Sequence, residues 1–199
     1  MASRGLRLRR LVVPANNNDG SPVTEHCVKG RRLFVKRDDL FRLEGSGLSG
    51  NKARKLFAVH NIPSQDFPKR MCSHGGAQSN AMLAIAKLAK SRGSEFFYFM
   101  KRLPDSLVSN PTGNFKAALE LGMRFIPISP VLYKELFDRE LLRKAGAIPE
   151  TIADLGLLPD EERGGGGEVN PEAKDYPLPA TLWLPQGGAC SLAEEGRRI

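Results

Sequence analysis

The sequence predicts an α/β fold in which helices cover both faces of a parallel sheet. Between residues 31 and 145, short apolar runs rich in Phe, Val and Ile alternate with longer stretches of helical period, as is typical of strand and helix units around a parallel sheet. Of the 199 residues, 41% are hydrophobic and 26% are charged, which is enough apolar material for a core. No run approaches the ~18 apolar residues of a membrane-spanning helix, so we expect no membrane partner.

The first half of this pattern contains two strands and two helices. The apolar run 32–36 predicts a strand, and after a loop rich in Gly and Ser the segment 51–59 has helical period. The short run 70–73 predicts a second strand, which ends at a His-Gly-Gly loop. The segment 78–92 predicts a helix that stops at Gly93. The expected apolar face of that helix contains Leu83, Ala86, Leu88 and Ala89.

The second half repeats the alternation of strand and helix. Its expected elements are a strand at 95–100, a helix at 114–121, a strand at 123–128 and a helix at 131–145. Connections between neighbouring parallel strands are almost always right-handed. Residues 70–145 are therefore expected to form one parallel sheet with helices on both faces.

The segments that flank this pattern differ from it in composition. Residues 1–20 form a basic leader in which four arginines precede the first acidic residue, Asp19. Such a leader is typical of a disordered terminus or of an organelle transit peptide. Residues 156–180 are rich in Gly, Pro and acidic residues and predict an insertion or linker. The run 181–185, which carries the only tryptophan, Trp183, predicts a further strand.

Charge and cysteine content exclude several classes of function. The net charge is +8, but four of the positive charges belong to the leader and the charges beyond residue 18 are mixed in sign, so we expect no nucleic-acid partner. The three histidines form no metal constellation. The cysteines are odd in number and widely spaced, which favours a reducing compartment over a disulfide framework or a zinc site; they are Cys27, Cys72 and Cys190. We expect a cytoplasmic protein, or an organellar one if the leader is a transit peptide.

The segment from residue 36 to residue 55 carries the densest motifs. Gly45, Gly47 and Gly50 match G-x-G-x-x-G between a strand and a helix, which is the spacing of a nicotinamide-nucleotide site. The nearest acidic candidate for a ribose contact, Asp66, is closer than the usual ~20 residues and lies in a loop. A phosphate-binding P-loop does not fit, because Ala53 stands where a Mg²⁺-binding hydroxyl is required.

A second hypothesis for the same segment places the chemistry on Lys52. Asn51 is a suitable N-cap, so Lys52 would lie in the first helical turn, near the positive end of the helix dipole. The neighbouring cations Arg54 and Lys55 would also favour a neutral amine, which Schiff-base chemistry requires. The alternative is an exposed lysine at a basic helix start.

A second cluster of polar residues lies at 73–80, between an expected strand and helix. In an open α/β sheet this is where ligands bind. Glycine amides together with the side chains of Gln78, Ser79 and Asn80 would suit a carboxylate or a phosphate. The alternative is that Ser79 or Asn80 only caps the helix, while Gly75 and Gly76 form the turn.

Taken together, these clusters resemble a known family. The motifs are KRDDL at residues 36–40, SGNKARK at 49–55 and GGAQSNAM at 75–82, with weaker similarity in NPTGNFKAALELGM at 110–123 and LPQGGA at 184–189. In this order and spacing they are similar to the pyridoxal-phosphate enzymes of the 1-aminocyclopropane-1-carboxylate deaminase and D-cysteine desulfhydrase family. The resemblance implies the tryptophan synthase β-like fold, fold type II of these enzymes, with pyridoxal 5'-phosphate between two α/β domains and a homodimer as the assembly.

The resemblance also implies roles for individual residues. Lys52 matches the lysine that forms the Schiff base with the cofactor, and Asn51 matches a neighbour that holds the cofactor region in place. Asn80 matches the residue beside the ring hydroxyl of the cofactor. Gln78 and Ser79 match the loop that receives the carboxylate of a small amino-acid substrate, and the adjoining Asn80 is a candidate for binding the substrate as well. Ser79 is also a candidate catalytic residue.

The resemblance further implies how the chain is divided. Residues 21–60 would begin the larger, cofactor-binding domain, residues 61–155 would form the smaller α/β domain, and residues 181–199 would return to the larger one. The phosphate loop of the family would follow Ile199, so we expect the chain to correspond to the first part of such an enzyme. Ala81 replaces a basic or polar residue of many relatives, which leaves deamination and β-elimination both open. The alternatives are a non-catalytic α/β fragment and a nicotinamide-nucleotide oxidoreductase.

Overall fold

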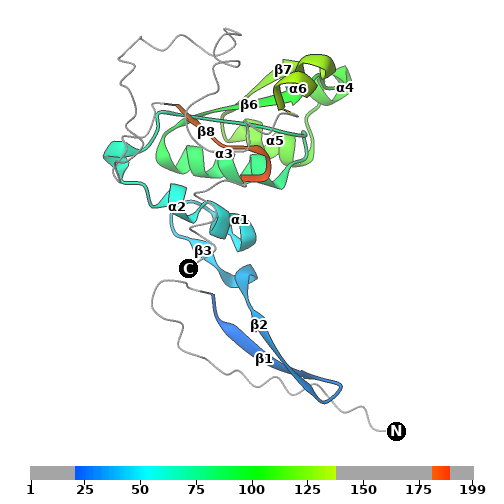
Figure 1. The fold of residues 1–199 in the computed structure, drawn as a ribbon. Helices are drawn as coiled ribbons and strands as arrows, with labels where there is room; N and C mark the ends of the chain where they lie inside the picture. Colours follow the sequence, from blue (N-terminus) through cyan, green and yellow to red (C-terminus); the bar gives the residue numbers. More distant parts are fainter. Residues whose placement is uncertain (1–20, 138–180, 189–199) are drawn as a thin grey trace.

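A four-stranded parallel sheet forms the centre of the molecule (Figure 1). The computed structural model describes residues 21–137 and 181–188. The strands lie in the order β7, β6, β5, β8, and every neighbouring pair is parallel. Their bounds are Arg70–His74 for β5, Glu95–Lys101 for β6, Met123–Ile128 for β7 and Thr181–Trp183 for β8. The predicted parallel sheet is therefore confirmed, and β8 joins it beside β5.

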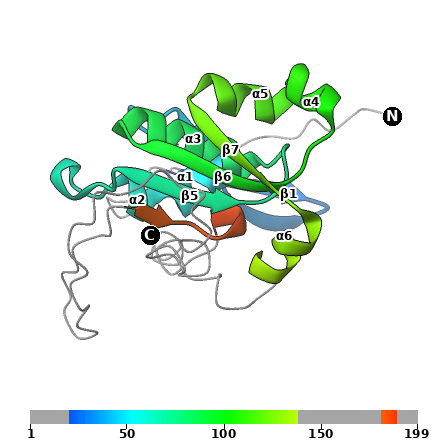
Figure 2. The ribbon, with the colours of Figure 1, turned by 90° about the horizontal axis from the view of Figure 1, so that it is seen from above.

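Helices cover both faces of this sheet, as the sequence predicts (Figure 2). The helices α3 and α5 pack together on one face and α6 lies on the other. Their bounds are Asn80–Arg92 for α3, Gly113–Glu120 for α5 and Pro130–Phe137 for α6. The α/β fold class with flanking helices is thus confirmed in the described residues.

Alternate residues of each strand supply the two cores, because successive side chains of a strand point to opposite faces. The face toward α3 and α5 carries Met71, Phe96, Tyr98, Met100 and Leu182. The opposite face carries Cys72, Phe97, Phe99 and Trp183. Burying a large apolar side chain of this kind stabilises the fold by about 1.5–3 kcal/mol relative to leaving it exposed. Burial on both faces therefore stabilises the sheet, and the sheet positions the loops that follow its strands.

The predicted strand at 32–36 does not belong to the parallel sheet. It is β2 (Arg31–Lys36), which pairs antiparallel with β1 (Val23–Val28) in a hairpin that extends away from the body (Figure 1). Lys29 and Gly30 form the two-residue turn with φ of 49° and 78°, as a type I′ turn requires. β1 is not evident as a strand in the sequence, because Glu25 and His26 interrupt its apolar signal. A second short hairpin consists of β3 (Arg42–Leu43) and β4 (Leu48–Ser49).

The predicted helix at 51–59 is two helices. They are α1 (Gly50–Lys55) and α2 (Phe57–His60), separated at Leu56, whose φ and ψ are −98° and 7°. The N-cap of α1 is Ser49 and not Asn51, which lies inside the helix. The prediction was wrong because Gly50, with φ of 65°, makes the sharp turn from β4 into α1. Lys52 remains in the first turn of the helix, as expected.

The other helices agree with the sequence more closely. α3 begins two residues later than predicted and ends at Gly93, which has φ of 71°. Of its predicted apolar face, only Leu83 is not fully buried. The short α4 (Asp105–Ser109) and the 3-10 turns η1 (Asp38–Leu40), η2 (Ser64–Asp66) and η4 (Gln186–Gly188) had not been predicted. Within the described residues no helix is long and apolar enough to cross a membrane.

Several expectations lie wholly or partly outside the described residues. They concern the leader 1–20, the linker 156–180, the part of the predicted helix 131–145 that follows residue 137, and the expected domain segments 138–155 and 189–199.

Candidate active site

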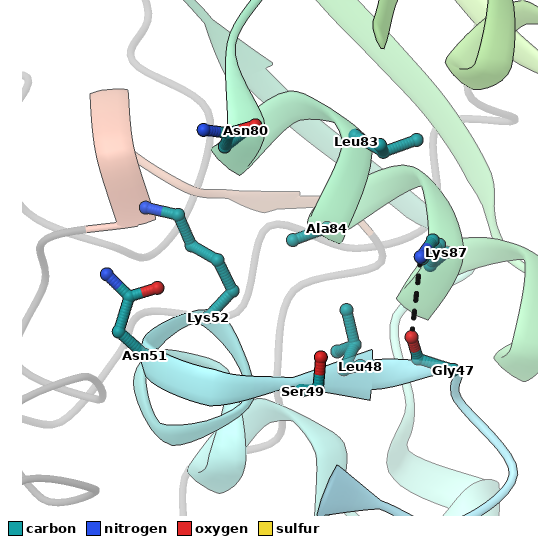
Figure 3. Close-up of a pocket in the computed structure, with 9 residues that line it drawn as sticks. All are labelled: Gly47, Leu48, Ser49, Asn51, Lys52, Asn80, Leu83, Ala84 and Lys87. Carbon is teal, nitrogen blue, oxygen red and sulfur yellow. Dashed lines mark hydrogen bonds between the residues drawn. The ribbon is translucent and has the colours of Figure 1, made fainter. Parts of the chain in front are cut away.

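The first turn of α1 presents Lys52 to a pocket between α1 and α3 (Figure 3). The β3–β4 hairpin leads directly into α1, and the Gly50 amide donates a hydrogen bond to Phe41 O at 2.9 Å. On the inner side of α1, Ala53 is fully buried in the core. The Lys52 side chain extends from the helix toward the N-terminal end of α3, where Asn80 lies (Figure 3).

The pocket brings together three of the residues that the sequence singles out. Its volume is about 290 Å³, which is close to the lower end of small-molecule sites. Lys52 and Asn51 come from α1, and Asn80 comes from the start of α3. The remaining lining residues are Gly47, Leu48, Ser49, Leu83, Ala84 and Lys87. Tertiary folding thus joins the SGNKARK and GGAQSNAM motifs in one site.

The environment of Lys52 favours the neutral amine. Burial lowers the pKa of Lys52, and the positive charge of Lys55 lowers it further. Within the described part of the chain, Lys52 Nζ forms no hydrogen bond or ion pair. Lys55 itself donates to Gly187 O at 3.3 Å. The half-buried amine therefore has the electrostatic setting of a nucleophile.

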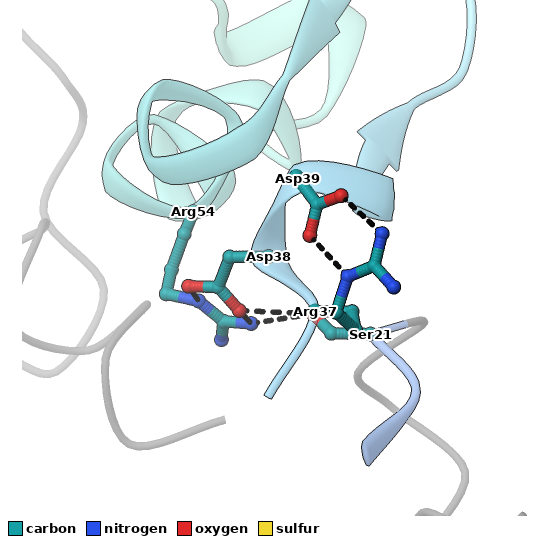
Figure 4. Close-up of polar contacts among 5 residues, drawn as sticks. All are labelled: Ser21, Arg37, Asp38, Asp39 and Arg54. Atoms are coloured by element: carbon teal, nitrogen blue, oxygen red, sulfur yellow. Dashed lines mark hydrogen bonds and ion pairs between the residues drawn. The ribbon is translucent and has the colours of Figure 1, made fainter. Parts of the chain in front are cut away.

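Arg54, which the sequence analysis expected to act on Lys52, instead binds Asp38 (Figure 4). Arg54 Nε and Nη2 donate to the two carboxylate oxygens at 2.8 and 2.7 Å, and Nη2 also donates to Ser21 Oγ at 2.7 Å. The hydrogen bonds from Arg54 hold the pKa of Asp38 below its usual range, although burial opposes them. This forked ion pair fixes η1, and with it part of the KRDDL motif, against α1. The next acid, Asp39, forms an exposed pair with Arg37 (Figure 4).

Ser79 is the N-cap of α3. Its Oγ accepts a hydrogen bond from the Met82 amide at 3.3 Å, so Ser79 does cap the helix. Burial raises the pKa of the Tyr98 phenol, and the nearby Ser79 side chain partly offsets this rise. Ser79 does not line the Lys52 pocket, and its contact with a substrate stays a prediction.

The Gln78 side chain is engaged by the start of α5. Its Oε1 accepts from the Asn114 amide at 2.9 Å, and its Nε2 donates to Thr112 O at 3.2 Å. The amide group is therefore held at both ends by the backbone of a neighbouring segment. In this conformation Gln78 orients the loop before α3, and its predicted contact with substrate is not tested.

Asn114 is a site residue that the sequence analysis missed. Its Nδ2 donates to Asn80 Oδ1 at 2.9 Å and to Gln78 O at 3.0 Å. Asn114 thereby fixes the orientation of the Asn80 amide at the edge of the Lys52 pocket. The signal was an amide residue in the NPTGNFK motif, but only the packing of α5 against α3 shows what it contacts.

The glycine motif does not have the context of a dinucleotide site. Gly45 and Gly47 lie in the turn between the antiparallel strands β3 and β4, whereas a dinucleotide fingerprint follows a strand of a parallel sheet and opens its crossover helix. Asp66 lies in η2, outside any strand end. The structure therefore gives no support to the oxidoreductase alternative. Among the described residues, no group of three or more His, Cys, Asp or Glu is placed to hold a metal ion.

The fold is of the α/β class that the sequence predicts, and comparison with known proteins finds a partial similarity. The chain is 32% identical over 130 residues, 61% of its own length, to the Thermotoga maritima protein described as "Putative 1-aminocyclopropane-1-carboxylate deaminase". It is thus a distant, partial relative of the 1-aminocyclopropane-1-carboxylate deaminase homologues, and the predicted resemblance is confirmed. It spans about two fifths (39%) of that relative.

The crystal structure of a 1-aminocyclopropane-1-carboxylate deaminase homologue aligns with a TM-score of 0.47 and 20% identity, over 84% of this chain and 41% of that one. No protein-family model matches the chain.

Proposed function

We propose that this chain is the lysine-bearing part of a pyridoxal-phosphate-dependent deaminase or lyase that acts on a small amino acid. The observation that carries the proposal is the pocket in which Lys52, with its lowered pKa, lies beside Asn51 and Asn80. The similarity to a 1-aminocyclopropane-1-carboxylate deaminase homologue supports it.

The residues of the pocket fit such a cofactor. A partly desolvated lysine amine is the group that binds an aldehyde, and the amide of Asn80 can hydrogen-bond a ring hydroxyl. When bound, pyridoxal phosphate supplies an electron-withdrawing ring that stabilises negative charge on the α-carbon of an amino acid.

The chain's own residues have distinct tasks in this proposal. Lys52 binds the cofactor through Nζ and, when released as a neutral amine, accepts or returns a proton at that atom. Asn51 holds the region around the lysine, and Asn80 orients the ring. Leu83 and Ala84 form an apolar side of the pocket. Ser79, at the loop before α3, receives the substrate carboxylate.

Covalent trapping tests the role of Lys52. The full chain would be incubated with pyridoxal phosphate, reduced with borohydride and mapped by mass spectrometry. We expect the adduct on Lys52 and its loss in the variant Lys52→Ala. Lys87 lines the same pocket and is the matched control, because Lys87→Ala removes an amine there without removing the proposed one. An adduct mapped to Lys87, or one that persists in Lys52→Ala, would refute the assignment.

The substrate and the assembly are further parts of the proposal. Release of ammonia from 1-aminocyclopropane-1-carboxylate would indicate the deaminase reaction, and release of sulfide from D-cysteine would indicate the β-elimination. We propose a homodimer as the working assembly, which analytical ultracentrifugation would test. A monomer at concentrations that support activity would contradict it.

A further inference from the structure

A second cavity lies at the carboxyl ends of the parallel strands. It has a volume of about 330 Å³. Its walls come from the loop after β5, from the end of β6 and from Gln186 after β8, while Tyr133 of α6 closes one side. The strand order places β6 and β8 on opposite sides of β5, so the cavity lies where connections diverge to the two sides of the sheet. This is the position at which open α/β sheets bind ligands.

The charge of this cavity is one-sided. Lys101 and Arg102 line it, and none of the nine described residues that line it is acidic. Lys101 Nζ lies 5.2 Å from the centre of the Tyr133 ring, which holds the ammonium at the cavity by a cation–π contact. The ion pair of Arg102 with Asp105 is long, 3.8 Å, and the two side chains are 78% and 91% exposed. Because such a pair is weak, Arg102 remains available to an incoming anion.

The neutral part of the lining suits an anion as well. Tyr133 presents a phenol that is fixed by a 3.1 Å hydrogen bond with His74 Nδ1, and Gln186 adds a side-chain amide. Gly75 and Gly76 leave the backbone open to the cavity. A Cβ at Gly75 would lie 2.4 Å from Tyr98 Oη, so this residue must be glycine, whereas a Cβ at Gly76 would meet nothing within 4 Å. The space beside Gly76 is therefore free for a ligand.

We propose that this cavity is a binding site for a small molecule that carries a carboxylate or phosphate group, held by Lys101 and Arg102. Among the described residues the two cavities have no lining residue in common, although residues 75–77 belong to the loop that leads to Ser79. The anion site proposed here depends on Lys101 and Arg102 and not on Lys52. Anion binding here therefore holds or fails independently of the cofactor assignment.

Two-dimensional NMR of the ¹⁵N-labelled full chain tests the proposal. Inorganic phosphate and succinate would be titrated in separate arms at constant ionic strength. We expect saturable shifts of the amides of Gly76, Ala77, Lys101 and Arg102. Saturation with phosphate alone, with succinate alone or with both would support the site and define its preferred anion. Shifts that do not saturate, or that are spread evenly over the surface, would overturn it.

Matched variants sharpen the test. Lys101→Gln combined with Arg102→Gln should weaken binding at least about tenfold, because each charge-assisted contact contributes roughly this factor. The control combines Lys90→Gln with Lys116→Gln, which removes the same charge from exposed positions of α3 and α5 and should leave affinity unchanged. Gly76→Leu should block binding by filling the cavity.

The variants also have a folding check. Unchanged amide signals of the core strands would show that each variant is folded. If the double variant does not fold, Arg102→Gln alone replaces it. Equal weakening by the control pair, or full affinity in the folded cavity variants, would contradict the proposal.

Discussion

Lowering the pH should destabilise the fold through His74. This residue ends β5 and is 4% exposed. Its ring stacks on Phe137 with the centres 4.1 Å apart and on Trp183 with the centres 5.6 Å apart. Burial lowers the pKa of His74 from 6.5 to about 4. The imidazole is therefore neutral in the folded chain at neutral pH, and protonating it places a charge in a buried aromatic cluster.

The size of the effect follows from the two pKa values. Between pH 6.5 and pH 4 the unfolded chain binds a proton at this residue that the folded chain does not bind, so stability falls as the pH falls. The contribution is fully present above pH 6.5 and is lost by about pH 4. A difference of 2.5 pKa units at 1.36 kcal/mol each gives about 3 kcal/mol over this window.

Trp183 reports this loss directly, because it is the only tryptophan in the chain and it stacks on His74. Urea unfolding would be followed by its fluorescence at several pH values from 7.5 to 4. The variant His74→Phe keeps an aromatic ring but cannot titrate. We expect it to lose most of the dependence on pH and to retain a smaller part from His60, whose pKa burial also lowers. An equal slope in the wild type and in His74→Phe would refute the reasoning.

Three further predictions follow from the site. Lys55→Gln should raise the pKa of Lys52 without restoring its ordinary value, since burial remains the larger cause. NMR titration of ¹³C-methylated lysines measures this pKa, and an unchanged or lower Lys52 midpoint would contradict the prediction. Asn114→Ala should loosen the loop between β5 and α3, because it removes two side-chain hydrogen bonds. We expect faster hydrogen exchange of the amides in that loop, and unchanged exchange rates would argue against a role of Asn114 in holding it. Asp38→Asn should destabilise the fold by about 2 kcal/mol, because it removes a carboxylate charge from beside the largely buried Arg54 guanidinium. Urea unfolding tests this, and a loss below about 0.5 kcal/mol, that of an ordinary surface substitution, would show the pair to be dispensable.

Local pattern was sufficient for the elements that form the sheet. The strand at 123–128 has the predicted bounds, since a strand's apolar run and the glycine that closes the preceding helix are both visible in the sequence. Gly93 likewise ends α3 as predicted. Residue propensity was less informative about the start of α1, because a turn decides where this helix begins. Gly50 moved the cap of α1 to Ser49, because its positive φ alters the direction of the chain in a way that composition does not reveal.

From the amino-acid sequence alone one can predict the α/β class, the two motifs that carry Lys52 and Asn80, and the strands and helices from residue 70 to residue 128 other than the short α4. These depend on periodicity, on caps and on residue type, which are properties of a local stretch of chain. The tertiary structure alone decided that Arg54 binds Asp38 while Lys55 acts on Lys52, and that Asn114 orients the Asn80 amide. Burial and contacts between distant segments set these relations, and neither is encoded in any single segment.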